Sequence, residues 1–128
     1  CTVRGVPLMT LIASFPCVKE RVNNWDEQVS KALWFSAELD KLGFIQLGDK
    51  PHRHDLLHFD APALSEISKR LRERGYFLYK ELKERGIWGP QPGLARSFKL
   101  STFAADRHPL GLVVDSFKAI LNKYSQQS

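Results

Sequence analysis

The sequence predicts an α+β fold in which helices cover one face of a small antiparallel sheet. Three observations lead to this prediction. The chain has 128 residues, the length of one domain. Hydrophobic residues make up 43% of it, enough for a sizeable core. Its periodic segments follow one another in the order α–β–β–α–α–β–α, which is typical of helices stacked on one side of an antiparallel sheet.

The first long helix is expected from Pro16 to Leu42, where apolar residues recur every three or four positions. Gly43 should end it, because glycine readily adopts the left-handed conformation that follows a helix. The preceding segment, VPLMTLIASF, is expected to form a separate short helix that meets the long one at a kink at Pro16. It is shorter than the roughly 20 residues of a membrane span, so we expect it to be buried in the protein.

Two short strands are expected next, from Phe44 to Leu47 and from Asp55 to Phe59, on either side of a Gly-Asp-Lys-Pro turn. This spacing predicts an antiparallel pair. Pro62 then opens a helix, Gly75 interrupts it, and a second helix over residues 76–85 follows.

The stretch RSFKLSTF predicts a third strand with two different faces. Phe98, Leu100 and Thr102 alternate with Lys99, Ser101 and Phe103. A last helix is expected from about Pro109 to Tyr124. Its buried stripe is predicted to consist of Leu112, Val113, Phe117, Ile120, Leu121 and Tyr124.

The chain is basic, with 19 Lys and Arg against 14 Asp and Glu, a formal net charge of +5. This surplus is compatible with a polyanionic partner without requiring one. The segment KRLRERGYFLYKELKER, residues 69–85, concentrates the cations. Glutamates interleave with them at helical spacing, so an ion-paired, solvated face is one interpretation and nucleic-acid contact is the other.

Three of the four histidines, His52, His54 and His58, lie within seven residues. No further ligand of a suitable type is close in sequence, so the segment PHRH, residues 51–54, is interpreted as a solvated, phosphate-friendly edge rather than a metal site. The two cysteines, Cys1 and Cys17, make no disulfide framework, and no secretory leader precedes them; this predicts a cytoplasmic protein. Cys17 is expected to be a buried free thiol in a helix.

Four blocks of the sequence, together with their order, carry a resemblance to a known family. They are CTVRGVPLMTLIASFP, GFIQLGDKPHRHDLLHF, RGYFLYKELKERGIWGPQPGLARSFKLSTF and VVDSFKAI. Over nearly its whole length the chain resembles the C-terminal part of O-phosphoseryl-tRNA:cysteinyl-tRNA synthase, a fold-type I enzyme that depends on pyridoxal phosphate. The resemblance implies the small C-terminal domain of such an enzyme, with residues 1–15 as a connecting segment and residues 16–128 as the small domain.

The implied reaction converts phosphoserine on tRNA(Cys) to cysteine by elimination of phosphate and addition of sulfur. Pyridoxal phosphate is the implied electron sink, and its Schiff-base lysine is expected in a large domain outside this chain, so the segment alone should be inactive. The implied partners are the phosphoseryl-tRNA, a sulfur donor, phosphoseryl-tRNA synthetase and, in the intact enzyme, a second copy of the same protein. The alternative is a free-standing, non-catalytic module that binds tRNA or acts as a scaffold.

The resemblance also implies site residues. Cys1 is expected to act in sulfur relay or as an iron–sulfur ligand, with Arg4 beside it lowering the pKa of the thiol. Arg96 and Lys99 are expected to contact the phosphoseryl phosphate or the end of the tRNA, with His52 and His54 as further contacts. For Arg96 and Lys99 a purely structural role at the sheet edge is the competing interpretation.

Overall fold

The computed structural model describes residues 5–103 and 105–126. Cys1 and Arg4 lie outside these residues, so their predicted roles stay predictions. The described residues form five helices and three strands: α1 (Gly5–Asn23), α2 (Trp25–Asp40), β1 (Ile45–Leu47), β2 (Leu56–Asp60), α3 (Pro62–Arg70), α4 (Tyr76–Glu84), β3 (Ser97–Ser101) and α5 (Arg107–Ser125). No helix in the described ranges is both long and apolar enough to cross a membrane.

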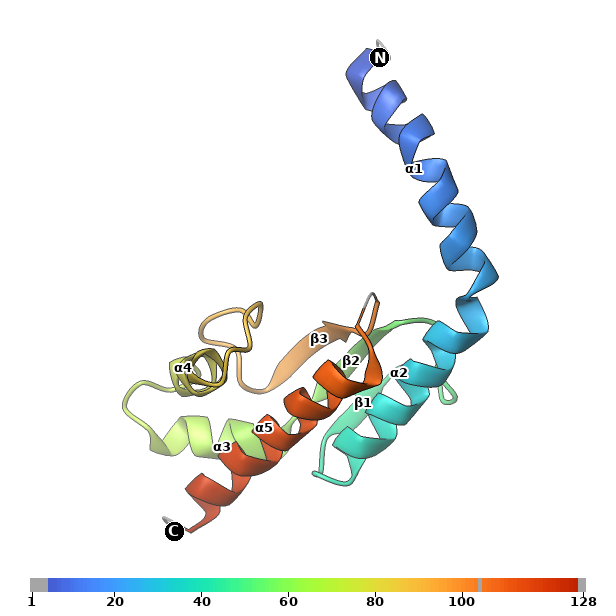
Figure 1. Ribbon diagram of the computed structural model, residues 1–128. Coiled ribbons are helices and arrows are strands. Elements are labelled where there is room, and N and C mark those ends of the chain that lie inside the picture. The colour runs from blue at the N-terminus through green and yellow to red at the C-terminus, as the bar shows by residue number, and fades with distance from the viewer. Residues whose placement is uncertain (1–4, 104, 127–128) are drawn as a thin grey trace.

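The three strands form one antiparallel sheet in the order β1-β2-β3. Figure 1 shows α2 and α5 side by side across this sheet. The alternation of side chains fits this arrangement, because Leu57 and Phe59 of β2 are buried while His58 between them is less so. The predicted α+β architecture, with helices on one face of a small antiparallel sheet, is therefore confirmed.

The core lies between the sheet and the helices. It includes four fully buried phenylalanine side chains, Phe35, Phe59, Phe77 and Phe117. Phe44 adds an edge-on contact with Phe117, with ring centroids 5.0 Å apart. Burying one such side chain contributes roughly 1.5 to 3 kcal/mol, so this cluster supplies much of the energy that holds the helices to the sheet.

Gly43 ends α2 as predicted. It has a φ of 81°, and the Phe44 N–H donates to the carbonyl of Leu39 at 3.2 Å while the Gly43 N–H donates to Asp40 at 2.9 Å. These two bonds make a Schellman ending, in which Phe44 packs back onto the last turn. The turn at Gly43 therefore directs the backbone from the end of α2 straight into β1, which begins at Ile45.

Helix α1 differs from the sequence prediction in two ways. Pro16 lies inside it, and the break comes later, at Asn24 between α1 and α2. Moreover, no residue of α1 is buried, so the predictions that VPLMTLIASF and Cys17 are buried are wrong. Figure 1 shows why: α1 projects away from the sheet and the other helices. An apolar segment can be buried only where other residues pack against it, and no part of the described chain packs over the apolar side chains of α1.

The last turn of α1 contacts the rest of the protein through Arg21. Arg21 pairs with the buried carboxylate of Asp55 at 2.7 Å, and its guanidinium lies 4.2 Å from the ring centroid of Phe103. The Asp55 backbone carbonyl in turn accepts a hydrogen bond from the Thr102 N–H at 2.9 Å. The start of β2, the end of β3 and the end of α1 thus meet at one point.

Helix α5 buries a slightly different stripe from the predicted one. Leu112 is exposed, whereas Leu110 and Val114 are buried together with Phe117 and Ile120. The helical period favours the observed set, because residues 110, 113, 114 and 117 share a face that excludes 112. The sequence prediction counted Leu112 for its apolar side chain alone.

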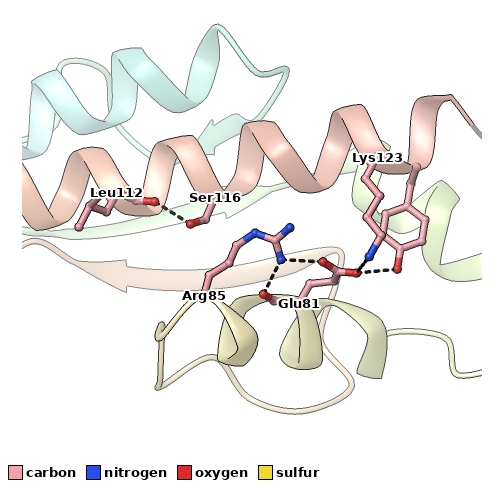
Figure 2. Close-up of polar contacts among 6 residues, drawn as sticks. Glu81, Arg85, Leu112, Ser116 and Lys123 are labelled. Carbon is pink, nitrogen blue, oxygen red and sulfur yellow. Dashed lines mark hydrogen bonds and ion pairs between the residues drawn. The ribbon is translucent and has the colours of Figure 1, made fainter.

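A buried carboxylate connects α4 to α5 (Figure 2). Glu81 accepts hydrogen bonds from Arg85 at 2.6 Å, from the Tyr124 hydroxyl at 3.0 Å and from Lys123. Burial alone would raise the pKa of Glu81, but these three donors outweigh it and leave the pKa below its ordinary value of 4.5. For Tyr124, burial and the bond to Glu81 raise the pKa of the phenol to about 12.

The raised pKa of Tyr124 predicts a loss of stability in alkaline solution. In the unfolded chain the phenol loses its proton near 10.0, while in the folded protein it keeps the proton up to about 12. Its contribution to the free energy of unfolding should be complete below pH 10 and disappear between these two values. Urea unfolding across this range should show a steeper fall for the natural protein than for Tyr124→Phe. Equal pH slopes in the two proteins would contradict the assignment.

Candidate functional site

The face of the sheet that the helices leave open carries both polar and apolar side chains. His58 of β2 and Lys99 of β3 are directly paired in the register of the two strands. Ile45, Leu47 and Leu56 are exposed on the same face. Because alternate residues of a strand point to opposite sides, this face follows from the alternation that buries Leu57 and Phe59.

A shallow basic pocket of about 440 Å³ lies at one side of this open face. It is lined by Leu47, Gly48, Asp49, His52, Arg53, His54, Leu56, His58 and Lys99. The residues come from the ends of β1 and β2, the turn between them, and β3. The β-turn that the sequence predicted between the first two strands thus forms a wall of the pocket.

Two cations of this basic pocket have no partner within the described part of the chain. Lys99 and Arg53 make no hydrogen bond or ion pair there, and both are exposed. One carboxylate, that of Asp49, lines the pocket with them. An excess of unpaired positive charge around a hollow is the arrangement that a phosphate group requires, with arginine as a bidentate donor and lysine as a point charge.

Arg96 is placed differently from Lys99. It lies just before β3, and its Nε donates to Asp60 Oδ1 at 3.3 Å. The Arg96 side chain is 74% exposed and does not line the basic pocket. It also does not line a second, apolar pocket that lies beside β3 and is described below. Its backbone carbonyl accepts a hydrogen bond from the Ala61 N–H at 2.7 Å. Arg96 therefore combines support of the sheet edge with a guanidinium that is still accessible to an anion.

His52 belongs to a buried polar network. One ring nitrogen, Nε2, bonds to the backbone carbonyl of Leu56, which can only accept, so Nε2 carries the proton. The other, Nδ1, then accepts from Gln46 at 3.1 Å, and Gln46 in turn accepts from Ser36. Both nitrogens of His52 are thus occupied, and its effect on the pocket is to fix the turn.

His54 stands next to His52, with ring centroids 4.1 Å apart. Its Nδ1 accepts a hydrogen bond from the Leu56 N–H at 3.2 Å, so the proton lies on Nε2. The ring is exposed at the pocket wall and has one N–H to offer. Across residues 5–103 and 105–126, no group of three or more His, Cys, Asp or Glu side chains could hold a metal ion.

Several of the cations of residues 69–85 have acidic partners. Lys69 pairs with Glu66 at 2.6 Å, Lys80 pairs with Glu73, and Arg85 pairs with Glu81. The ion-paired interpretation therefore accounts for these three residues. The two exposed pairs, Lys69–Glu66 and Lys80–Glu73, contribute little to stability, about 0 to 1 kcal/mol each, whereas Glu81 is buried. Lys83 instead lies against an aromatic ring, with its ammonium 5.0 Å from the ring centroid of Trp88.

A second, apolar pocket of about 600 Å³ lies beside β3. It is lined by His58, Leu78, Leu82, residues 87–91, Leu94, the whole of β3, Val113 and Phe117. His58 and Lys99 line both pockets, so the two hollows are adjacent. Arg53 lies in the PHRH segment that the sequence predicted as a phosphate-friendly edge, although it was not named as a site residue. His58 and Trp88 were not predicted as binding residues, although the glycine- and proline-rich stretch around Trp88 marked an irregular loop.

Comparisons with known proteins agree on one family of relatives, although no protein-family model matches the chain. The chain is 57% identical over 124 residues to O-phospho-L-seryl-tRNA:Cys-tRNA synthase of Methanosarcina acetivorans. It is 49% identical over 123 residues to O-phospho-L-seryl-tRNA:Cys-tRNA synthase 2 of Archaeoglobus fulgidus. These matches cover 97% and 95% of this chain and 32% of each relative, so the chain spans about a third of their length.

A solved structure supports the same relation. The chain is similar to a chain in the crystal structure of a SepCysS–SepCysE N-terminal domain complex, with a TM-score of 0.86 and 45% sequence identity. The match covers 97% of this chain and 33% of that chain. Sequence and fold therefore give the same correspondence over the same fraction of the relatives.

Proposed function

Because this chain is related in sequence and fold to about a third of O-phospho-L-seryl-tRNA:Cys-tRNA synthase, we propose that it is a substrate-holding part of such an enzyme. Its role there is to bind tRNA-linked phosphoserine during the conversion to cysteine. Residues 16–128 act as the small domain and residues 1–15 as the connection to the rest of the enzyme.

The observation that carries the proposal is the pair of unpartnered cations, Arg53 and Lys99, at the basic pocket on the open face of the sheet. The carboxyl group of a tRNA-linked amino acid is esterified, so the anions left to recognise are the seryl phosphate and the phosphates of the RNA. A guanidinium and an ammonium at one hollow suit that task. The net charge of +5 also favours approach of RNA.

The described residues do not fit the cofactor of the proposed enzyme. The buried lysine, Lys31, donates to the carbonyl of Ala105 at 3.0 Å, and Lys99 stands on an open strand face. Neither lies in an enclosed cradle that would hold a pyridine ring and its phosphate. The contribution of this chain to the enzyme is therefore substrate binding.

Replacing Lys99 or Arg53 by alanine should weaken binding of phosphoseryl-tRNA by about 1 to 2 kcal/mol, roughly 5- to 30-fold, as expected for one exposed charge-assisted hydrogen bond. Each change should also reduce the slope of log affinity against log salt by about 0.7 to 0.9 for each phosphate that is no longer neutralised. The measurement is an equilibrium titration across a salt series. Lys118→Ala is the matched control, because Lys118 is an exposed cation of α5 that lines neither pocket.

Unchanged affinity and slope in both variants would contradict the proposal. The alternative function, a non-catalytic module that binds tRNA, is distinguished by a second comparison. A substrate-holding part should prefer phosphoseryl-tRNA over seryl-tRNA and should lose this preference with Lys99→Ala. A module that contacts only the RNA backbone should bind the two tRNAs equally.

A further inference from the structure

Most of the side chains that line the apolar pocket beside β3 are apolar. Leu78 and Leu82 of α4, Val113 of α5 and residues 87–91 are among its lining residues, and no carboxylate lines it. Its volume of about 600 Å³ lies within the roughly 300 to 1,000 Å³ of typical ligand pockets. The pocket therefore suits an apolar, uncharged group.

Trp88 presents a large exposed ring at this pocket. It is 68% exposed, more than the other large hydrophobic residues that line the pocket. Two contacts hold the Trp88 ring in place without a ligand. Lys83 lies against the ring, and the Ile87 N–H donates to the carbonyl of Leu82 at 2.9 Å, which fixes the backbone just before Trp88. An indole held at the rim of a pocket offers a flat surface on which another ring can stack.

Hydrogen-bonding groups also line the pocket, along the outer edge of β3. The Ala61–Arg96 and Thr102–Asp55 bonds show that even-numbered residues of this segment pair with β2. The backbone groups of Ser97, Lys99 and Ser101 therefore point away from β2, and no backbone bond satisfies them in the described part of the chain. These donors and acceptors are of the kind that reads the edge of a base.

We propose that the apolar pocket binds the nucleobase of the 3′-terminal nucleotide of the tRNA, stacked on Trp88. The terminal nucleotide carries the phosphoseryl ester, so its base and the seryl phosphate are close in the substrate. The apolar pocket and the basic pocket are also adjacent, because His58 and Lys99 line both, so the base and the phosphate of one substrate could occupy the two pockets together. The inference rests on the proposed function and adds to it the part of the RNA that is recognised.

The test compares two tRNA probes, one intact and one with an abasic 3′-terminal nucleotide, across a salt series. Trp88→Ala should bind the intact tRNA about tenfold more weakly, while Trp88→Phe, which keeps an aromatic face, should retain most of the affinity. The salt slope should not change, because Trp88 neutralises no phosphate. The abasic probe should bind the natural protein about tenfold more weakly and show no further loss with Trp88→Ala.

Leu112→Ala is the matched control, since Leu112 is an exposed apolar residue that lines neither pocket. If Trp88→Ala binds the intact tRNA as tightly as the natural protein does, the inference is overturned. It is also overturned if the abasic probe binds as tightly as the intact one. Equal binding of the intact and abasic probes is the result expected if the edge of β3 pairs with a peptide instead of a nucleobase. These outcomes leave the proposed function standing if Lys99→Ala and Arg53→Ala still reduce affinity and salt slope.

Discussion

Replacing Glu81 by alanine should lower the free energy of unfolding by about 2 to 3 kcal/mol. Removing one partner of a buried ion pair typically costs roughly 3 to 5 kcal/mol, because the remaining charge stays desolvated. Here the remaining partners, Arg85 and Lys123, keep side-chain exposures of 29% and 47%, so water can partly replace the missing carboxylate. The expected loss is therefore smaller than that range, but larger than for an exposed pair.

The measurement is urea unfolding of the two proteins at neutral pH. Glu84→Ala is the matched control, because it removes an exposed glutamate from the same helix and should change the free energy by no more than about 0.5 kcal/mol. Glu81→Gln should fall between the two, since the amide can still accept a hydrogen bond from Tyr124. Equal stability of Glu81→Ala and Glu84→Ala would show that the contacts in Figure 2 do not stabilise the fold.

Gly75→Ala should destabilise the protein by about 1 to 3 kcal/mol, the usual cost of forcing extra volume into packed structure. A Cβ at position 75 would lie 2.0 Å from the carbonyl oxygen of Gly93 and 2.5 Å from its carbonyl carbon. Both are backbone atoms, so the loop before β3 must shift to make room. Because Leu94 and residues 87–91 line the apolar pocket, the same change should also weaken tRNA binding.

Gly111→Ala provides the contrasting case. Gly111 lies within α5, and an added Cβ there meets nothing within 4 Å. Alanine is favoured over glycine inside a helix by roughly 0.5 to 1 kcal/mol, so this variant should be slightly more stable than the natural protein. The measurement is thermal unfolding of the two variants and the natural protein, which compares their melting temperatures. A Gly75→Ala protein as stable as Gly111→Ala would rule out the close contact with Gly93.

Much of the fold was predictable because its signals are local. Pro62 at the start of α3, the glycines at positions 75 and 86, and the alternation in β3 each act on the residues next to them. Lys99 was named through the family resemblance, and the local alternation of the strand correctly placed it on the face opposite Phe98 and Leu100.

Other features depend on contacts that are distant in sequence. The role of His52 follows from Gln46 and the Leu56 carbonyl, and only the folded turn brings these groups together. The difference between Arg96 and Lys99 depends on Asp60, which lies 36 residues before Arg96. Trp88 could not be distinguished from other exposed residues until the pockets were located, and Arg53 was marked only as part of the predicted phosphate-friendly segment PHRH.

Helix α1 has a consequence for the distribution of local stability. None of its 19 residues is buried, and its interior proline cannot donate a backbone hydrogen bond. Most helices in proteins are stabilised by packing of an apolar face, and α1 buries none of its residues, so little more than the Arg21–Asp55 pair and intrinsic propensity maintain α1 as a helix. Its amides therefore belong to the fast end of hydrogen exchange, while those of β2, paired on both edges, belong to the slow end.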